Sequence, residues 1–156
     1  MFHFREELKK YLEDCFSKDG SLTPSKKPKV YNGYQVGHEP SAKTPEIQIQ
    51  PLNNSEQREF TTFCGKNANS VPIQIAVCTG QLKIGGIDYN AQDGSTLLGE
   101  KVEKYIYEYI YSLKNEKLYN GSLVDSSPEL PMNDGGTIYT NILRFDFIIA
   151  YPYEVG

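Results

Sequence analysis

The sequence RFDFIIAYPY, residues 144–153, is typical of a β-strand whose two faces differ in polarity. Successive side chains of a strand point to opposite sides of the sheet. One face is apolar throughout and consists of Phe145, Phe147, Ile149 and Tyr151. The other begins with charged residues and ends with apolar ones: Arg144, Asp146, Ile148 and Ala150. We therefore expect a sheet with helices on one side and a different covering on the other.

Two segments outside this strand show the spacing of amphipathic helices. The segment from about 95 to 114 has an apolar stripe of Leu98, Val102, Tyr105, Ile106, Tyr109, Ile110 and Leu113. Residues 2–16 have a stripe of Phe4, Leu8, Tyr11, Leu12, Cys15 and Phe16. Asp93 or Ser95 is the expected N-cap of the second helix. Each helix has a single apolar stripe, so both are expected to pack on a sheet face.

Alternating polarity predicts the remaining strands at residues 30–37, 46–52, 71–80 and 137–151. In EIQIQPL, residues 46–52, the isoleucines are expected inside and the glutamines outside. The connections are a Pro- and Ser-rich linker at 20–29 and two long polar loops at 53–70 and 115–136. The loop at 53–70 is expected to hold a short ribbon around REFTTF. These elements predict a single α/β (α+β) domain over 1–156: a mixed sheet of about four strands, with two helices on one face.

Composition excludes several classes of protein. The net charge is −4 over 156 residues, whereas nucleic-acid-binding proteins usually carry a basic patch. The short basic cluster KKPK, residues 26–29, is expected to be solvated. The three cysteines are far apart and lack neighbouring histidines, so neither a zinc site nor a disulfide framework is predicted. The first ten residues predict neither a signal peptide nor a membrane span. We expect a protein made in a cytoplasm.

No catalytic motif is present in the sequence, and no cofactor is expected. The segment DYNAQDG, residues 88–94, resembles the opening of a calcium loop, but Gly99 stands where the bidentate Glu is needed. Glycines before the second helix could hold an anion, but Asp88 and Asp93 would repel it. His3 and His38 are expected to be exposed residues without a catalytic role.

Tyrosine is the unusual residue, with twelve copies and no tryptophan. Tyr105 and Tyr109 belong to the apolar stripe of the second helix. Tyr107 and Tyr111 are expected on its polar side, one turn apart. Two interpretations remain open for this pair: a tolerated aromatic pair at the surface, or part of an interaction surface.

The order of the predicted elements is the first helix, EIQIQPL, the polar excursion, VPIQIAVCTG, the helix GEKVEKYIYEYIYSLK and the strand ILRFDFIIAYPY. Taken together, these elements resemble the tail terminator (tail completion) proteins of long-tailed bacteriophages. The resemblance covers nearly the whole chain and rests on element order and length. It implies a structural virion protein without catalytic residues, which assembles into a six-membered ring, a homo-hexamer, that caps the tail tube and joins it to the head–tail connector.

The resemblance also implies the partners: further copies of the chain, the tail tube protein and the head–tail connector protein. DNA would only pass through the lumen, and no membrane is involved. Assembly would occur in the host cytoplasm, and the finished protein would lie at the head–tail junction of the virion. The expected assembly residues are Tyr107, Tyr111, Arg144 and Asp146.

Two alternatives remain open at the level of sequence. One is another neck or minor capsid component of the same virion. The other is a small cytoplasmic ligand-binding or enzymatic domain that uses the loop at 80–94.

Overall fold

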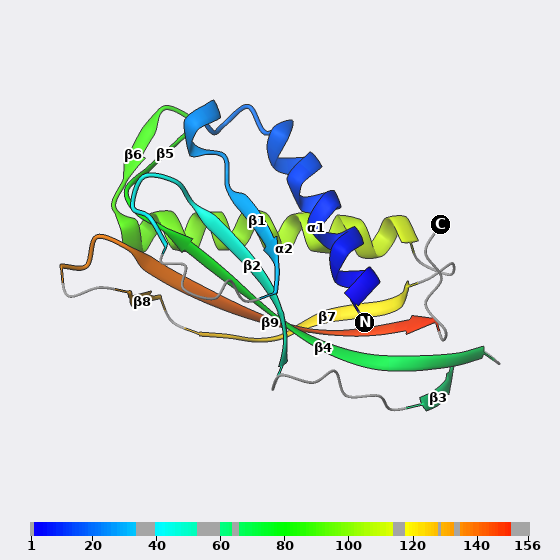
Figure 1. The fold of residues 1–156 in the computed structure, drawn as a ribbon. Helices are drawn as coiled ribbons and strands as arrows, with labels where there is room; N and C mark the ends of the chain where they lie inside the picture. The colour runs from blue at the N-terminus through cyan, green and yellow to red at the C-terminus, as the bar shows by residue number, and fades with distance from the viewer. Residues whose placement is uncertain are drawn as a thin grey trace.

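The computed structural model describes residues 2–33, 40–52, 60–63, 66–113, 118–127, 129–132 and 135–150. The N-terminal elements are α1 (Phe2–Ser17), the 3-10 helix η1 (Pro24–Lys26), β1 (Lys29–Asn32), β2 (Glu46–Pro51), β3 (Phe60–Phe63) and β4 (Lys66–Thr79). They are followed by β5 (Leu82–Ile84), β6 (Ile87–Tyr89), α2 (Ala91–Leu113), β7 (Leu118–Ser126), β8 (Leu130–Pro131) and β9 (Tyr139–Ala150). Figure 1 shows their arrangement.

The described strands form one seven-stranded sheet and a separate hairpin of β5 and β6. The main path of the sheet is β1-β2-β4-β9-β7, and β3 and β8 pair with β4 and β9 respectively. β1 runs parallel to β2, and the other pairs are antiparallel. The central pair is β4 and β9, in register from Ala68 opposite Ala150 to Thr79 opposite Tyr139. β1 and β7 therefore lie at opposite edges of the main path.

Both helices pack on the same face of the sheet (Figure 1). Their apolar stripes meet the alternate apolar side chains of the central strands, among them Ile47, Ile49, Val71, Ile73, Ile75, Val77, Leu143, Phe145, Phe147 and Ile149. The Phe4 ring of α1 contacts the Phe147 ring edge-on, with centroids 5.0 Å apart. The predicted fold class, a mixed sheet with two helices on one face, is confirmed. The sheet has more strands than the four expected.

The second helix begins earlier than the sequence suggested. Asn90 Oδ1 accepts a hydrogen bond from the Asp93 backbone N–H at 2.8 Å, which makes Asn90 the N-cap. The prediction of Asp93 or Ser95 as the N-cap was therefore wrong. Ala91 is only 7% exposed, so the first turn of α2 already packs against the domain. The first helix, predicted at residues 2–16, extends over Phe2–Ser17.

The two long loops contain more regular structure than expected. Residues 66–70 belong to β4, and the predicted ribbon is present as β3 paired with the start of that strand. The connection at 115–136 contains β7 and β8, both paired with β9. These segments were predicted as loops because they carry turn-forming residues, and that prediction was wrong for 66–70, 118–126 and 130–131.

The segment at 20–29 is not a free linker either. Leu22 is 4% exposed and belongs to the core. The Lys27 ammonium donates a hydrogen bond to the Ser17 carbonyl at 2.5 Å, and the Lys26 ammonium donates one to the Lys43 carbonyl at 2.8 Å. The segment thereby fastens the end of α1 to the loop before β2. The weak strand predicted at 30–37 is β1 up to Asn32; residues 34–39, with His38, lie outside the described residues.

Candidate functional site

The sheet face turned away from the helices carries a row of polar side chains across four strands. Gln50 of β2, Gln74 of β4, Arg144 of β9 and Asp125 of β7 are successive cross-strand partners. Gln74 Nε2 donates to Gln50 Oε1 at 3.4 Å, and Gln50 Nε2 donates to Gln48 Oε1 at 2.8 Å. Arg144 Nη1 donates to Asp125 Oδ2 at 3.0 Å. The row is thus ordered within a single copy of the chain.

Asp146 lies beside this row, on the same uncovered face. The Ser70 hydroxyl donates to Asp146 Oδ1 at 3.2 Å. Arg144 and Asp146 are both partly exposed, and the Arg144–Asp125 side chains are 38% and 61% exposed. An ion pair this open contributes about 0–1 kcal/mol to stability. The uncovered face is consequently available for contact at little cost to the fold; contact with a partner through Arg144 and Asp146 stays a prediction.

The structure separates the two tyrosines that the sequence placed together. Tyr111 is 73% exposed. Tyr107 instead packs between α2 and the sheet: its ring lies 6.2 Å from that of Phe145, and its hydroxyl accepts the Leu123 backbone N–H at 3.0 Å. The prediction that Tyr107 lies on the polar side was wrong, because the sheet extends under this side of α2 through β7. Of the pair, Tyr111 alone remains a candidate contact residue.

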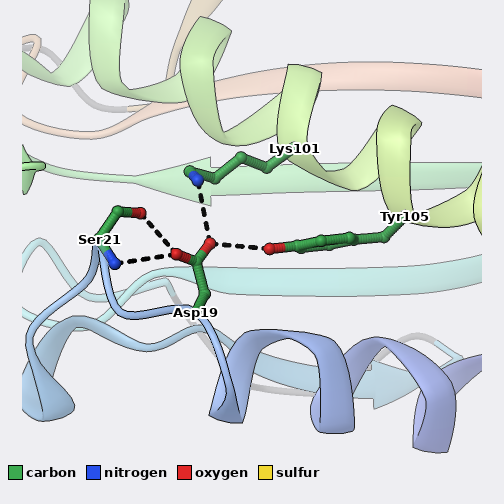
Figure 2. A network of polar contacts seen from close by, with 4 residues as sticks. All are labelled: Asp19, Ser21, Lys101 and Tyr105. Atoms are coloured by element: carbon green, nitrogen blue, oxygen red, sulfur yellow. Dashed lines mark hydrogen bonds and ion pairs between the residues drawn. The ribbon is translucent and has the colours of Figure 1, made fainter.

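A half-buried polar network joins the two helices (Figure 2). Asp19, just after α1, accepts hydrogen bonds from the Lys101 ammonium and the Tyr105 hydroxyl of α2, both at 2.9 Å. The Ser21 hydroxyl and backbone N–H also donate to Asp19. Burial raises the pKa of Asp19, but the hydrogen bonds from Ser21, Lys101 and Tyr105 outweigh it and hold this pKa well below its ordinary value. The network therefore holds the helices together as an ionised cluster.

The loop at 80–94 borders an open groove of about 620 Å³. Its lining comprises Lys26, Ala42, Lys43, Gln81, Asp88, Tyr89, Asn90, Ala91, Gly136 and Thr137. Two residues of the calcium-like segment are used locally, since Asn90 caps α2 and Asp88 lies 3.9 Å from the Lys83 ammonium. Among the described residues, no three His, Cys, Asp or Glu side chains gather as a metal site. The groove is a candidate site for a small molecule.

A second, acidic crevice of about 200 Å³ lies between α2 and the β7 edge of the sheet. We call it the acidic crevice; its lining is Thr96, Gly99, Glu100, Glu103, Leu123, Ser126, Ser127, Glu129, Asn141 and Leu143. Glu129 accepts a hydrogen bond from the Thr96 hydroxyl at 2.6 Å, which lowers the pKa of Glu129. Asn141 is 6% exposed, and its Oδ1 has no hydrogen-bond partner among the residues that the structure describes. The lining of the crevice thus combines carboxylates with a buried amide, that of Asn141, whose oxygen accepts no hydrogen bond from the described residues.

Sequence reasoning missed this crevice. Its residues come from α2, β7 and β9 and are brought together only by the strand pairing of β7, which was predicted as loop. The spacing of Thr96, Glu100 and Glu103 on one side of a helix was the available signal, because residues three and four apart share a helix face.

The described helices include none that is long and apolar enough to cross a membrane. Comparison of the chain with protein-family models and with curated proteins finds no match.

Proposed function

We propose that this chain is a structural virion protein that forms a ring, caps the tail tube of a long-tailed phage and joins it to the head–tail connector. The observation that carries the proposal is the uncovered sheet face. Both helices occupy one face, while the other presents the ordered row from Gln50 to Asp125. Gln50, Gln74 and Arg144 are half-buried, and Asp125 is exposed. A polar, preordered face suits a wet contact surface or the wall of a lumen.

Exposed apolar side chains add support. Val124 is 66% exposed, Leu130 47% and Met132 46%, and all three lie at or near the β7–β8 edge. Tyr111 adds a large exposed ring on α2. Aromatic residues and methionine are enriched in protein interfaces. The net charge of −4 suits a lumen through which DNA slides, because fixed negative charge weakens phosphate binding.

The experiment is to mix the purified protein with isolated tail tubes and image the tube ends by electron microscopy. The proposal predicts extra density at one end of each tube, and no binding along the sides. Protein that binds neither tube end, at concentrations where it is folded, would contradict the capping role. Binding to the connector alone would favour the alternative of another neck component.

The groove at the 80–94 loop favours one second candidate, a ligand-binding or enzymatic domain. A ligand that binds only the folded protein must raise its melting temperature. Titration with calcium, zinc and nucleotides tests this: the structural proposal predicts no change, whereas a saturable rise with any of them supports the second candidate.

A further inference from the structure

The groove beside the 80–94 loop is built from four separate parts of the chain. Its lining comes from η1, from the loop before β2, from the segment that leads through the β5–β6 hairpin into α2, and from the loop before β9. The Gly85 backbone N–H of the hairpin donates to the Ser21 carbonyl, just before η1, at 2.9 Å. A Cβ at Gly80 would come 2.5 Å from the Ala42 carbonyl oxygen, so the loop before β2 lies directly against the end of β4. These contacts hold the groove in shape.

Two lysines give the groove its charge. Lys26 is half-buried, and its ammonium group donates a hydrogen bond to the Lys43 backbone carbonyl at 2.8 Å, which brings the two residues together in the lining. Lys43 is exposed, and its ammonium group has no hydrogen-bond or ion-pair partner in the part of the chain that the structure describes. Asp88 is the one acidic residue in the described lining, and it lies 3.9 Å from the Lys83 ammonium. The lining is therefore net positive, in a chain whose net charge is −4.

The lining favours a carboxylate over a phosphate group. A carboxylate carries a single negative charge, whereas a phosphate monoester carries about −1.5 to −2 at neutral pH. Asp88, which lines the same groove, would repel the larger charge more strongly. The described lining also contains no arginine, the residue that binds phosphate through two parallel hydrogen bonds. Lysine ammonium groups form charge-assisted hydrogen bonds with carboxylates.

The open shape of the groove favours a segment of polypeptide over a small molecule. Small-molecule sites usually bury about 70–90% of the surface of their ligand. A groove of about 620 Å³ that is open to solvent leaves much of such a ligand uncovered. A segment of chain can instead lie across the groove, with its peptide groups beside polar residues of the lining such as Gln81 and Thr137.

We propose that this groove binds an acidic segment of another protein, with a carboxylate of that segment held by the ammonium groups of Lys26 and Lys43. The lysines then have the partner that the groove's net positive charge calls for. The site belongs to a single copy of the chain, so the inference does not depend on the proposed ring.

NMR titration of the ¹⁵N-labelled protein with synthetic peptides tests the inference. The probes are three acetylated and amidated peptides of equal length, in which glycine alternates with glutamate, with glutamine or with lysine. The glutamate peptide should shift the backbone amide signals of the lining residues saturably, and the other two should not. Free glutamate and inorganic phosphate, added separately, should bind at least about tenfold more weakly than the glutamate peptide, because they lack its peptide-group contacts.

Charge-removing variants assign the binding to the two lysines. Lys26→Gln combined with Lys43→Gln should weaken binding of the glutamate peptide at least about tenfold. Lys43→Gln alone should also weaken it, and this change removes no side-chain contact with the described residues. The matched control is Lys10→Gln with Lys104→Gln, which removes the same charge from two exposed helix positions outside the lining. The control should bind like the wild type, and circular dichroism melts check that all variants fold.

Three results would overturn the proposal. The first is a glutamate peptide that shifts no lining residue, or that binds the Lys26→Gln, Lys43→Gln protein as tightly as the control. The second is free glutamate or phosphate that binds as tightly as the peptide, which would assign the groove to a small anion. The third is a shift of the same amide signals when the protein alone is concentrated, which would place a second copy in the groove. Each result is obtained without tail tubes, so none of them decides the capping role.

Discussion

Gly99 of α2 lies directly against the Asn141 amide of β9, and a Cβ at position 99 would approach Asn141 Nδ2 well inside 3.0 Å. Gly99→Ala should therefore lower the free energy of unfolding by about 1–2 kcal/mol, because overpacking outweighs the better helix propensity of alanine. Urea denaturation measures this. The double variant Gly99→Ala with Asn141→Ala should lose less free energy of unfolding than the sum of the losses in the two single variants. If the losses of the two single variants simply add in the double variant, residues 99 and 141 are not in the close contact described here.

Removal of the Asp19 carboxylate should be costly. Asp19→Ala leaves the Lys101 ammonium and the Tyr105 hydroxyl without their shared acceptor, and the Asp19 side chain is only 8% exposed. We expect a loss of about 2–3 kcal/mol in the free energy of unfolding. The matched control is Asp14→Ala, which removes an exposed ion pair with Lys18 and should cost at most about 0.5 kcal/mol. Equal losses in the two variants would show that the Asp19 network does not hold the helices together.

The same network predicts a pH dependence. The folded pKa of Asp19 lies below the unfolded value, which is about 3.9 for aspartate. The carboxylate's contribution to stability is therefore complete above the unfolded pKa and is lost as pH falls through the folded pKa. The stability difference between wild type and Asp19→Asn should be largest near neutral pH and shrink below about pH 4. A difference that does not change down to acid unfolding would rule out the ionised cluster.

The two tyrosines of α2 should behave differently. Tyr107→Phe removes the hydrogen bond to the Leu123 N–H and should destabilise the fold by about 1 kcal/mol. Tyr111→Ser should change stability by less than about 0.5 kcal/mol, because the ring is 73% exposed. Thermal melts of the two variants give this comparison. Under the proposed function, Tyr111→Ser should weaken assembly instead, which sedimentation detects; unchanged assembly would remove Tyr111 from the contact.

The helices could be predicted from the sequence because their signal is local. Leu98, Val102 and Ile106 recur with the helical period, and each is fully buried against the sheet. The end of α2 was predictable to within a residue, but its start was not. Asn90 acts as N-cap only because the chain enters the helix directly from the β5–β6 hairpin, which the glycine-rich sequence did not reveal.

β7 was missed for a physical reason. Its sequence LYNGSLVDS contains an Asn-Gly pair, which is a frequent turn signal. In the structure Gly121 belongs to the strand, and a Cβ there would come within 2.8 Å of Phe147 and 2.9 Å of Ile110. The glycine permits close packing of the strand under α2 and makes no turn. The position of Tyr107 and the acidic crevice depend on this strand, so they could not be predicted without it.

The uncovered face was predictable in outline. The charged start of the RFDFIIAYPY face placed Arg144 and Asp146 away from the helices, and the structure places them there. The partners of these residues were not predictable. Asp125 reaches Arg144 across the bulged register between Leu123 and Asp125, which no local pattern encodes.

The central claim is that the functional form is a closed ring of identical copies. Sedimentation of the purified wild-type protein over a range of concentrations, with electron microscopy of the assembled fraction, tests it most directly. We predict a single assembled species with the mass of about six copies and a central hole, since a closed heterologous contact gives one defined ring. A protein that stays monomeric at high concentration and on addition of tail tubes would contradict the claim.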